Sequence, residues 1–300
     1  MIIKKIYNRL VCYLILFLYF ILKVVTNIFD FILNLLIVPV ETFPNTYRGP
    51  RIAAASIEKS LPIISIKYDS SSIIKFFCPG VMPIYRAQTA LTKEPETIDW
   101  INRFASNSTF WDIGANVGVY SLFAGKKNHK VFAFEPSAPN YFVLNKNIEL
   151  NSLDKQISAL NIALTSKNEI AYLQMGDTTL GAALNSFKTA VREDGESFNV
   201  QYSQSSLGFT VDEFISYYQL DTPNYIKIDV DGNEGDILSG MVNTIINPDL
   251  KSVLIELASA RDDYDDIINF FKANNFTSCK IVDAALDSSS DIRNHIFSRV

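Results

Sequence analysis

The N-terminal part of the chain combines an unbroken apolar run with an interrupted one. Residues 10–22 are all apolar, and Lys23, Asn27, Asp30 and Asn34 interrupt the apolar positions that follow. At about 100° per residue, these four polar side chains fall within an arc of roughly 60° on a helix. The pattern therefore predicts one long helix that is fully apolar in its first half and amphipathic in its second half.

From residue 92 onward, strand-like apolar runs alternate with amphipathic, helix-like ones. The predicted strands are residues 108–113, 130–135, 157–164, 169–175, 225–230, 252–257, 276–282 and 293–299. The predicted helices are residues 92–106, 117–127, 138–151, 210–219, 234–246 and 263–275. Such alternation is typical of an α/β protein with a mostly parallel sheet and helices on both faces.

Two segments do not follow this alternation. Residues 41–91 begin with scattered prolines and contain two strand-like runs, 63–68 and 72–77, whose spacing predicts a hairpin. Residues 176–206 are polar and lack periodicity, which predicts a long functional or mobile loop. We therefore expect a hydrophobic segment (1–40), a linker and N-terminal cap (41–91), and one large domain (92–300).

Charge and cysteine content exclude some functions. The 300 residues are 48% hydrophobic, which is enough for a sizeable core. After residue 40, 23 basic residues face 31 acidic ones, and such a surface does not favour nucleic acid, because binding a phosphate backbone needs clustered cations. Three dispersed cysteines and two histidines indicate a reducing compartment and predict no metal site built from Cys and His.

The hydrophobic segment is long enough to suggest an association of the protein with a membrane. Residues 10–38 would form a helix about 44 Å long, whereas a bilayer core is about 30 Å thick. We therefore expect this segment to associate with a membrane, either crossing it with strong tilt or lying partly in the interface. The alternative is that the helix packs on the body of the protein as core.

The first candidate motif follows the predicted strand 108–113. It reads DIGANVG, with Asp112, Gly114, Asn116 and Gly118 at alternate positions before a helix. Its spacing is not the GxGxxG of a dinucleotide-binding loop. Asp112 would repel a diphosphate but attract a cation. S-adenosylmethionine (SAM) has an ammonium, a sulfonium and no phosphate, so the motif fits SAM better than NAD; the alternative is a purely structural turn.

The second motif, FEPS, ends the next strand. Glu135 could accept hydrogen bonds from both hydroxyls of a ribose, which is how nucleoside cofactors are held in this type of sheet. Pro136 fixes the turn, and Ser137 could cap the following helix. The alternative role of Glu135 is that of an ordinary carboxylate at a helix start.

The third motif is YIKIDVDGNEGDIL, residues 225–238. An EF-hand register centred on Gly232 would place Lys227 and Leu238 at ligand positions, which excludes that loop. A hard-cation site built from Asp229, Asp231 and Glu234 stays an alternative. A period of two would place Lys227, Asp229 and Asp231 on one face at the strand end, while Glu234 suits the start of the next helix.

Taken together and in this order, these motifs resemble the FkbM family of SAM-dependent methyltransferases. DIGANVGVYS, FEPSAPNYFVLNKNIELN, NIAL and YIKIDVDGNEGDILSG carry the resemblance, which continues weakly to NHIF. It implies a Rossmann-like class I methyltransferase fold, SAM as cofactor, and methyl transfer, usually to oxygen. The cofactor-binding residues would be Asp112, Gly114, Ala115, Asn116 and Gly118 at the methionine end, Glu135 and Pro136 at the ribose, and Asn161 and Ala163 near the adenosine.

The resemblance also directs attention to Asp229, which would face the site of methyl transfer. We name Asp229 as the first candidate for a general base, with Lys227, Asp231 and Glu234 behind it; the alternative is that Asp229 only orients SAM. The acceptor would carry a hydroxyl on a glycan, a lipid-linked molecule or a secondary metabolite. Because SAM is cytosolic, we expect a membrane-associated protein with its catalytic domain in the cytoplasm.

Two other functions stay open from the residues alone. One is a dinucleotide-dependent oxidoreductase or epimerase, which the missing GxGxxG disfavours. The other is a non-catalytic SAM-binding protein on the same fold. The oligomeric state is not indicated by the sequence.

Overall fold

The computed structural model describes residues 2–37, 57–69, 72–192, 195–283 and 292–299. Residues 38–56, which make up most of the predicted proline-containing linker, lie outside the described residues. The chain divides into two compact units, residues 1–61 and residues 62–300. The hairpin, the sheets and every candidate site residue belong to the second unit.

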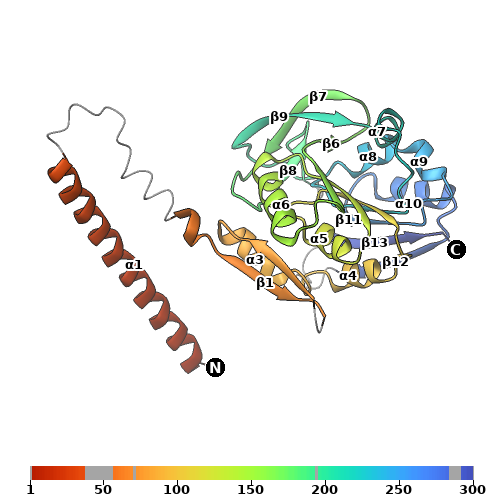
Figure 1. Ribbon diagram of the computed structural model, residues 1–300. Coiled ribbons are helices and arrows are strands. Elements are labelled where there is room, and N and C mark those ends of the chain that lie inside the picture. Colours follow the sequence, from red (N-terminus) through yellow and green to blue (C-terminus); the bar gives the residue numbers. More distant parts are fainter. Residues whose placement is uncertain (1, 38–56, 70–71, 193–194, 284–291, 300) are drawn as a thin grey trace. The chain divides into compact units, whose positions relative to one another are not determined.

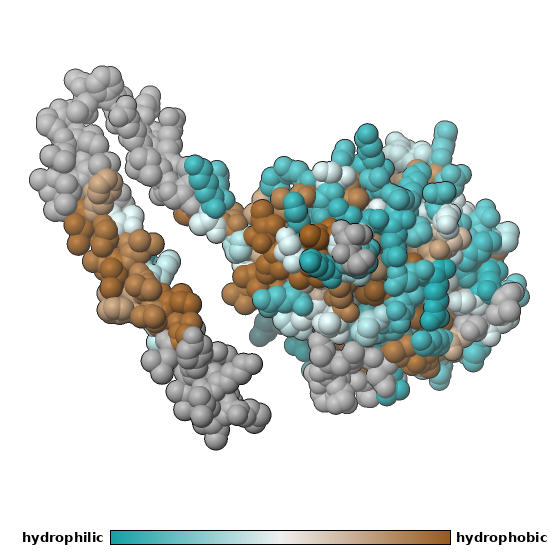
Figure 2. All heavy atoms as spheres, turned by 60° about the horizontal axis from the view of Figure 1, so that its bottom comes forward, coloured by the Kyte–Doolittle hydropathy of each residue, from teal (hydrophilic) through white to brown (hydrophobic). Residues whose placement is uncertain are grey.

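The first unit contains the long helix α1, Ile2–Ile37, where the apolar pattern predicted a helix. Its described side chains, residues 11 and 13–29, are mostly large, apolar and exposed, and they form the brown stretch of this helix in Figure 2. The helix itself is thus as predicted.

The membrane-associated localisation that we predicted from this segment is wrong. Within the part of the chain that the structure describes, no helix combines the length and the apolar character needed to cross a membrane. The unbroken apolar run of residues 10–22 has thirteen residues before Lys23 ends it, whereas a crossing needs about 20.

The second unit is built around a seven-stranded sheet in the order β12-β13-β11-β10-β3-β4-β5, in which only β13 runs antiparallel. The strands are β3 Thr109–Ile113, β4 Lys130–Phe134, β5 Ile157–Leu160, β10 Tyr225–Ile228, β11 Ser252–Ala258, β12 Ser278–Asp283 and β13 Ile292–Ser298. The chain winds outward from β3 to β5 and then returns to β10 on the other side of β3. This is a Rossmann-like sheet, and ligands bind at the carboxyl ends of the strands where the winding reverses.

Helices cover both faces of this sheet (Figure 1). One face packs against α4 Pro95–Asn102, α5 Val119–Lys126 and α6 Ala138–Asn151; the other packs against α7 Val211–Tyr218, α8 Glu234–Ser239, α9 Val242–Ile246 and α10 Tyr264–Ala273. Alternation along β3 supplies both cores, because Phe110 points into the first core and Trp111 and Ile113 point into the second. Successive residues of a strand therefore place their side chains in opposite cores.

A second sheet of four strands includes two strands from the segment that we expected to be a loop. Its strands are β6 Ala163–Leu164, β7 Glu169–Met175, β8 Asn185–Phe187 and β9 Tyr202–Phe209, in the order β6-β9-β7-β8. The expectation of a long loop over residues 176–206 is wrong for β8 and the first part of β9. The pattern of β9 is inverted, because Ser206 and Gly208 are buried while Leu207 is 47% exposed, so apolar periodicity could not reveal this strand.

The hairpin of β1 Ile63–Lys67 and β2 Ile73–Phe77 is held to the domain by two amides of α6. Asn151 accepts a hydrogen bond from the Lys75 amide at 3.0 Å and donates one to the Lys75 carbonyl at 2.7 Å. Asn147 accepts from the Phe77 amide at 2.6 Å and donates to the Val117 carbonyl at 2.8 Å. The same pair of side chains therefore fixes both the hairpin and the loop before α5, and α3 Val81–Thr89 follows directly from the hairpin.

We predict that Asn151→Ala lowers the free energy of unfolding by about 1–3 kcal/mol, because it leaves the Lys75 amide and carbonyl without their partners. Urea unfolding followed by circular dichroism measures this change. Asn145→Ala is the matched control, since Asn145 is exposed on the same helix and donates only to Tyr141 of its own helix. Equal effects of the two substitutions would contradict the docking role of Asn151.

Candidate functional site

The turn after β3 lies directly against the end of β10. Gly114 has φ +82°, and its amide and that of Ala115 each donate to the Phe134 carbonyl at 3.0 Å. A Cβ atom on Gly114 would lie only 1.8 Å from the Asp229 carbonyl oxygen. Glycine is thus required both by the backbone conformation and by the close approach. This contact joins the first and third sequence motifs.

Gly118 closes the same loop with φ +88°, and a side chain there would collide with Leu144 of α6. The loop DIGANVG therefore fits tightly between the sheet and α6, with its amides toward the strand ends.

Glu135 lies at the end of β4 and is 5% exposed. Its carboxylate accepts hydrogen bonds from the Asn116 amide at 2.7 Å and the Ser137 amide at 2.9 Å. Burial raises the pKa of Glu135 to about 7, although these amide bonds favour the charged form. The structure thus joins the second motif to the first through Asn116.

Two buried oxygens of the first motif lack donors among the described residues. Asp112 is 1% exposed, and its Oδ2 accepts from Ser121 at 2.6 Å while its Oδ1 has no partner. Asn116 donates to the Ala182 carbonyl at 2.9 Å, and its own Oδ1 has no partner. Neither oxygen is accessible from the surface, and of the two residues only Asn116 lines a cavity.

The residues expected near the adenosine line a different part of the site. The Asn161 side chain donates to the carbonyls of Glu135 and Pro136, at 2.8 and 2.9 Å, and so holds this turn. Pro136 and Ala163 line an apolar cavity with about 340 Å³ of empty space, together with Gly114. Mostly apolar side chains line this cavity, and Pro136 places it next to the end of β4.

The third motif brings Lys227 and Asp229 together as an ion pair. The Lys227 side chain is 1% exposed and its ammonium lies 4.9 Å from the centre of the Tyr120 ring, whereas Asp229 is 30% exposed and can reach a ligand. Burial alone would raise the pKa of Asp229, but the ammonium groups of Lys227 and Lys93 lower it to about 2. Burial alone would lower the pKa of Lys227, but Asp229 and Glu94 raise it above its usual value.

Asp231 and Glu234 turn away from this pair. Asp231 accepts from the Asn185 amide at 2.7 Å, and the buried Glu234 pairs with Arg261. The strand β10 ends at Ile228 and Gly232 adopts φ +98°, so a period of two does not continue to Asp231. The structure therefore does not gather Asp229, Asp231 and Glu234 into the hard-cation site that we kept as an alternative.

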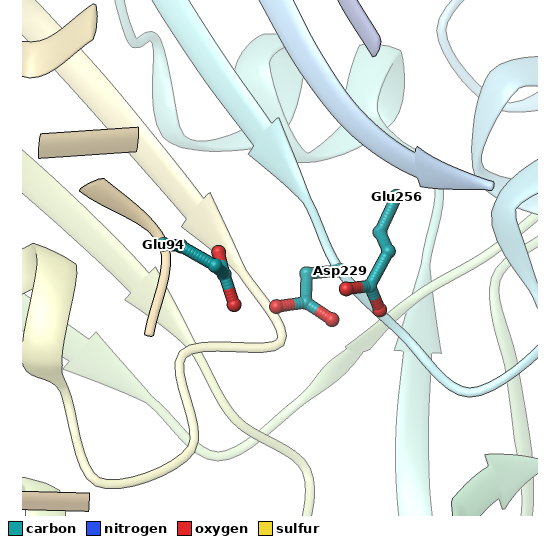
Figure 3. Close-up of side chains that lie close together, drawn as sticks. All are labelled: Glu94, Asp229 and Glu256. Carbon is teal, nitrogen blue, oxygen red and sulfur yellow. The ribbon is translucent and has the colours of Figure 1, made fainter. Parts of the chain in front are cut away.

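Two other carboxylates converge on Asp229 instead, and sequence reasoning missed both. In Figure 3 the Asp229 carboxylate lies between those of Glu94 and Glu256, and one oxygen of each lies within 4.8 Å of the others. Carboxylate oxygens are the ligands that hard divalent cations prefer, so these three could hold such an ion within the part of the chain that the structure describes. Lys227 and Lys93 already balance part of their charge.

No pattern singled these two residues out beforehand. Glu94 lies just before α4, where its carboxylate resembled an ordinary helix-start residue, and Glu256 lies inside the apolar strand β11. The one available indication was that a carboxylate in the middle of a buried strand is unusual and needs a partner.

These groups surround an open cavity with about 450 Å³ of empty space at the carboxyl ends of β3 and β10. Its walls include Gly114, Asn116, Tyr120, Lys227, Asp229 and Glu94. The segment 181–187 lies across these strand ends, because its backbone contacts Asn116, Asn140, Asp231 and Asn233. The cavity is therefore bounded by parts of the chain before and after the glycine loop.

The family model of the methyltransferase FkbM domain matches residues 112–278. The chain belongs to this family. The family match thus begins at Asp112, and Arg86, Lys93 and Glu94, which line the same cavity, precede it.

Two curated relatives of this FkbM-family chain are methyltransferases. Hexuronic acid methyltransferase AglP of Haloferax volcanii is 22% identical over 160 residues, covering 53% of this chain and 59% of AglP. Methyltransferase sdnD of Sordaria araneosa is 28% identical over 163 residues, covering 47% of this chain and 63% of sdnD. The chain spans less than two thirds of either relative.

Among solved structures, the precorrin-6y C5,15-methyltransferase of Geobacter metallireducens superimposes with a TM-score of 0.42 at 12% identity, covering 69% of this chain and 87% of that one.

We predict that Glu135 makes folding stability fall as pH rises. The pKa of Glu135 is about 7 in the folded protein, whereas its ordinary value is 4.5. The stabilisation that protonated Glu135 gives to the folded state is therefore complete below pH 4.5 and is lost as the pH rises through 7. Relative to Glu135→Gln, the wild type should lose roughly 1–3 kcal/mol of unfolding free energy over this window. Urea unfolding at several pH values measures the difference. The control Glu149→Gln, whose side chain is 69% exposed, should show no such slope, and a flat difference for Glu135→Gln would contradict the prediction.

Proposed function

We propose that this FkbM-family protein is a SAM-dependent methyltransferase that methylates a hydroxyl group, on a sugar or a secondary metabolite. The observation that carries the proposal is the contact between the Gly114 turn and Asp229, which joins a cofactor-type loop to an ion pair in the wall of one cavity. The family match supports methyl transfer, and the name of AglP supports a sugar acid as one type of acceptor.

The residues present fit SAM as the cofactor. Residues 114–117 and Asp229 line the larger cavity and suit the methionine end of SAM, Glu135 offers a carboxylate for ribose hydroxyls, and the apolar cavity beside Pro136 and Ala163 suits the adenine. SAM would supply an electrophilic methyl group on a positively charged sulfur. The carboxylates of this site favour such a cation electrostatically.

The same charges disfavour a dinucleotide. A diphosphate near the DIGANVG loop would face the buried carboxylate of Asp112, with Asp229 and Glu94 in the adjoining wall. Because Arg86, Lys93 and Lys227 line the same wall, the main observation against the oxidoreductase alternative is the missing GxGxxG spacing. The family match also points away from it.

In this proposal Asp229 positions the acceptor hydroxyl. With a pKa near 2, its carboxylate stays ionised and is a weak base, since an effective general base has a pKa near the working pH. It is nevertheless a strong hydrogen-bond acceptor, and Lys227 holds it in one orientation. Aligning the acceptor oxygen is the main contribution a protein makes to a displacement of this kind.

The test is incubation of the protein with SAM labelled on its methyl group and with sugar and metabolite fractions of cell extract, followed by identification of the labelled product. We expect a labelled methyl ether. Binding of SAM without transfer to any fraction would support the non-catalytic alternative, and binding of NAD but not SAM would support the oxidoreductase.

We predict that Asp229→Asn lowers turnover by about 100-fold or more while the affinity for S-adenosylhomocysteine changes only a few-fold, because the amide no longer holds the acceptor hydroxyl as a charged group does. The rate of label transfer and calorimetric titration measure the two quantities. Asp221→Asn, at an exposed carboxylate, is the control and should behave like wild type. A near-normal rate for Asp229→Asn would remove Asp229 from this role.

A further inference from the structure

Three cations line the charged cavity, but only two of them are paired. Lys227 forms an ion pair with Asp229, and Lys93 pairs with Glu94 at 3.0 Å. Arg86, on α3, lines the same cavity and forms no ion pair among the residues that the structure describes. Arg86 is therefore the cation of this wall without a direct ion pair, and Glu135 and Asp231 act on it only as more distant charges.

The Arg86 guanidinium is held in place from one side only. Its Nε donates to the Gly181 carbonyl at 2.6 Å, and this is its only hydrogen bond within the described ranges. The two terminal nitrogens are left without a protein acceptor in those ranges. Because the side chain is half-buried and anchored through Nε, little conformational freedom is lost when these nitrogens bind a ligand.

We propose that Arg86 is a carboxylate-binding residue of this cavity. A guanidinium with free terminal nitrogens matches the two oxygens of a carboxylate, and such charge-assisted bonds are about twice as strong as neutral ones. The proposal rests on the function proposed above. The carboxylate has two possible sources, namely the methionine part of SAM or an acid group on the acceptor, such as that of a sugar acid.

The first arm of the test separates the cofactor's carboxylate from its adenosine. S-adenosylhomocysteine has the amino-acid group, whereas 5′-methylthioadenosine lacks it, and both are titrated calorimetrically into wild type and Arg86→Gln. If the cofactor is the source, Arg86→Gln lowers the affinity for S-adenosylhomocysteine by about 10- to 100-fold. The affinity for methylthioadenosine then changes by only a few-fold.

The second arm examines the acceptor. With S-adenosylhomocysteine present, binding of methyl glucuronide and of its neutral counterpart methyl glucoside is followed by saturation-transfer NMR. If the acceptor is the source, Arg86→Gln leaves the cofactor affinity unchanged and loses the signal of the glucuronide but not that of the glucoside.

Controls separate recognition from structure. Arg86→Lys keeps the positive charge but lacks the paired terminal nitrogens of a guanidinium, so it should bind the carboxylate with intermediate affinity. Arg103→Gln, at an exposed arginine, should bind like wild type. Thermal melting checks that each variant is folded, since Arg86 also holds Gly181.

Two results would overturn the assignment. The first is that Arg86→Gln binds every carboxylate probe as tightly as wild type does. The second is that it loses affinity for S-adenosylhomocysteine and methylthioadenosine equally, which would mean that Arg86 has a purely structural role. Wild type that binds neither nucleoside would overturn the proposed function, and the assignment of Arg86 with it.

Discussion

The burial of one lysine ammonium constrains the arrangement of the candidate site. Lys227 lies on the central strand β10 with 1% of its side chain exposed, and removing a charge from water costs several kcal/mol unless counter-charges surround it. Asp229 pairs with it directly, while Glu94 and Asp112 contribute attraction from neighbouring elements. The Tyr120 ring covers it at 4.9 Å. A fixed cation at the floor of the cavity thus holds carboxylates from separate parts of the chain in one place.

The order of the strands in the sheet brings this group of charges next to the glycine loop. β3 and β10 are neighbours only because the chain reverses its direction of winding, and the backbone of Gly114 then touches that of Asp229. The cavity is completed from outside the family-matched region, by Arg86 and Glu94 before it. Segment 181–187 crosses the strand ends as well, so residues that confer selectivity can lie far in sequence from the cofactor motifs.

The main sheet could be predicted from the sequence because its central strands β3, β10 and β11 are buried on both faces and read as short apolar runs. In the second sheet the residues of β6 and β7 were predicted as strands, but β8 and β9 were not, since β9 buries Ser206 and Gly208 and exposes Leu207, the reverse of the usual pattern. The membrane prediction failed because it relied on total apolar length, and Lys23 limits the unbroken run to residues 10–22.

The sequence by itself determined the order of the three motifs, the tight glycine turn after β3, and the carboxylates at the ends of β3, β4 and β10. These features could be predicted because strand ends, tight turns and helix starts each favour particular residue types. Only the tertiary structure decided that Asp231 turns to Asn185 while Glu94 and Glu256 converge on Asp229. Those contacts depend on which strands become neighbours and on the neutralisation of a buried charge, and both are properties of the folded chain that no local pattern encodes.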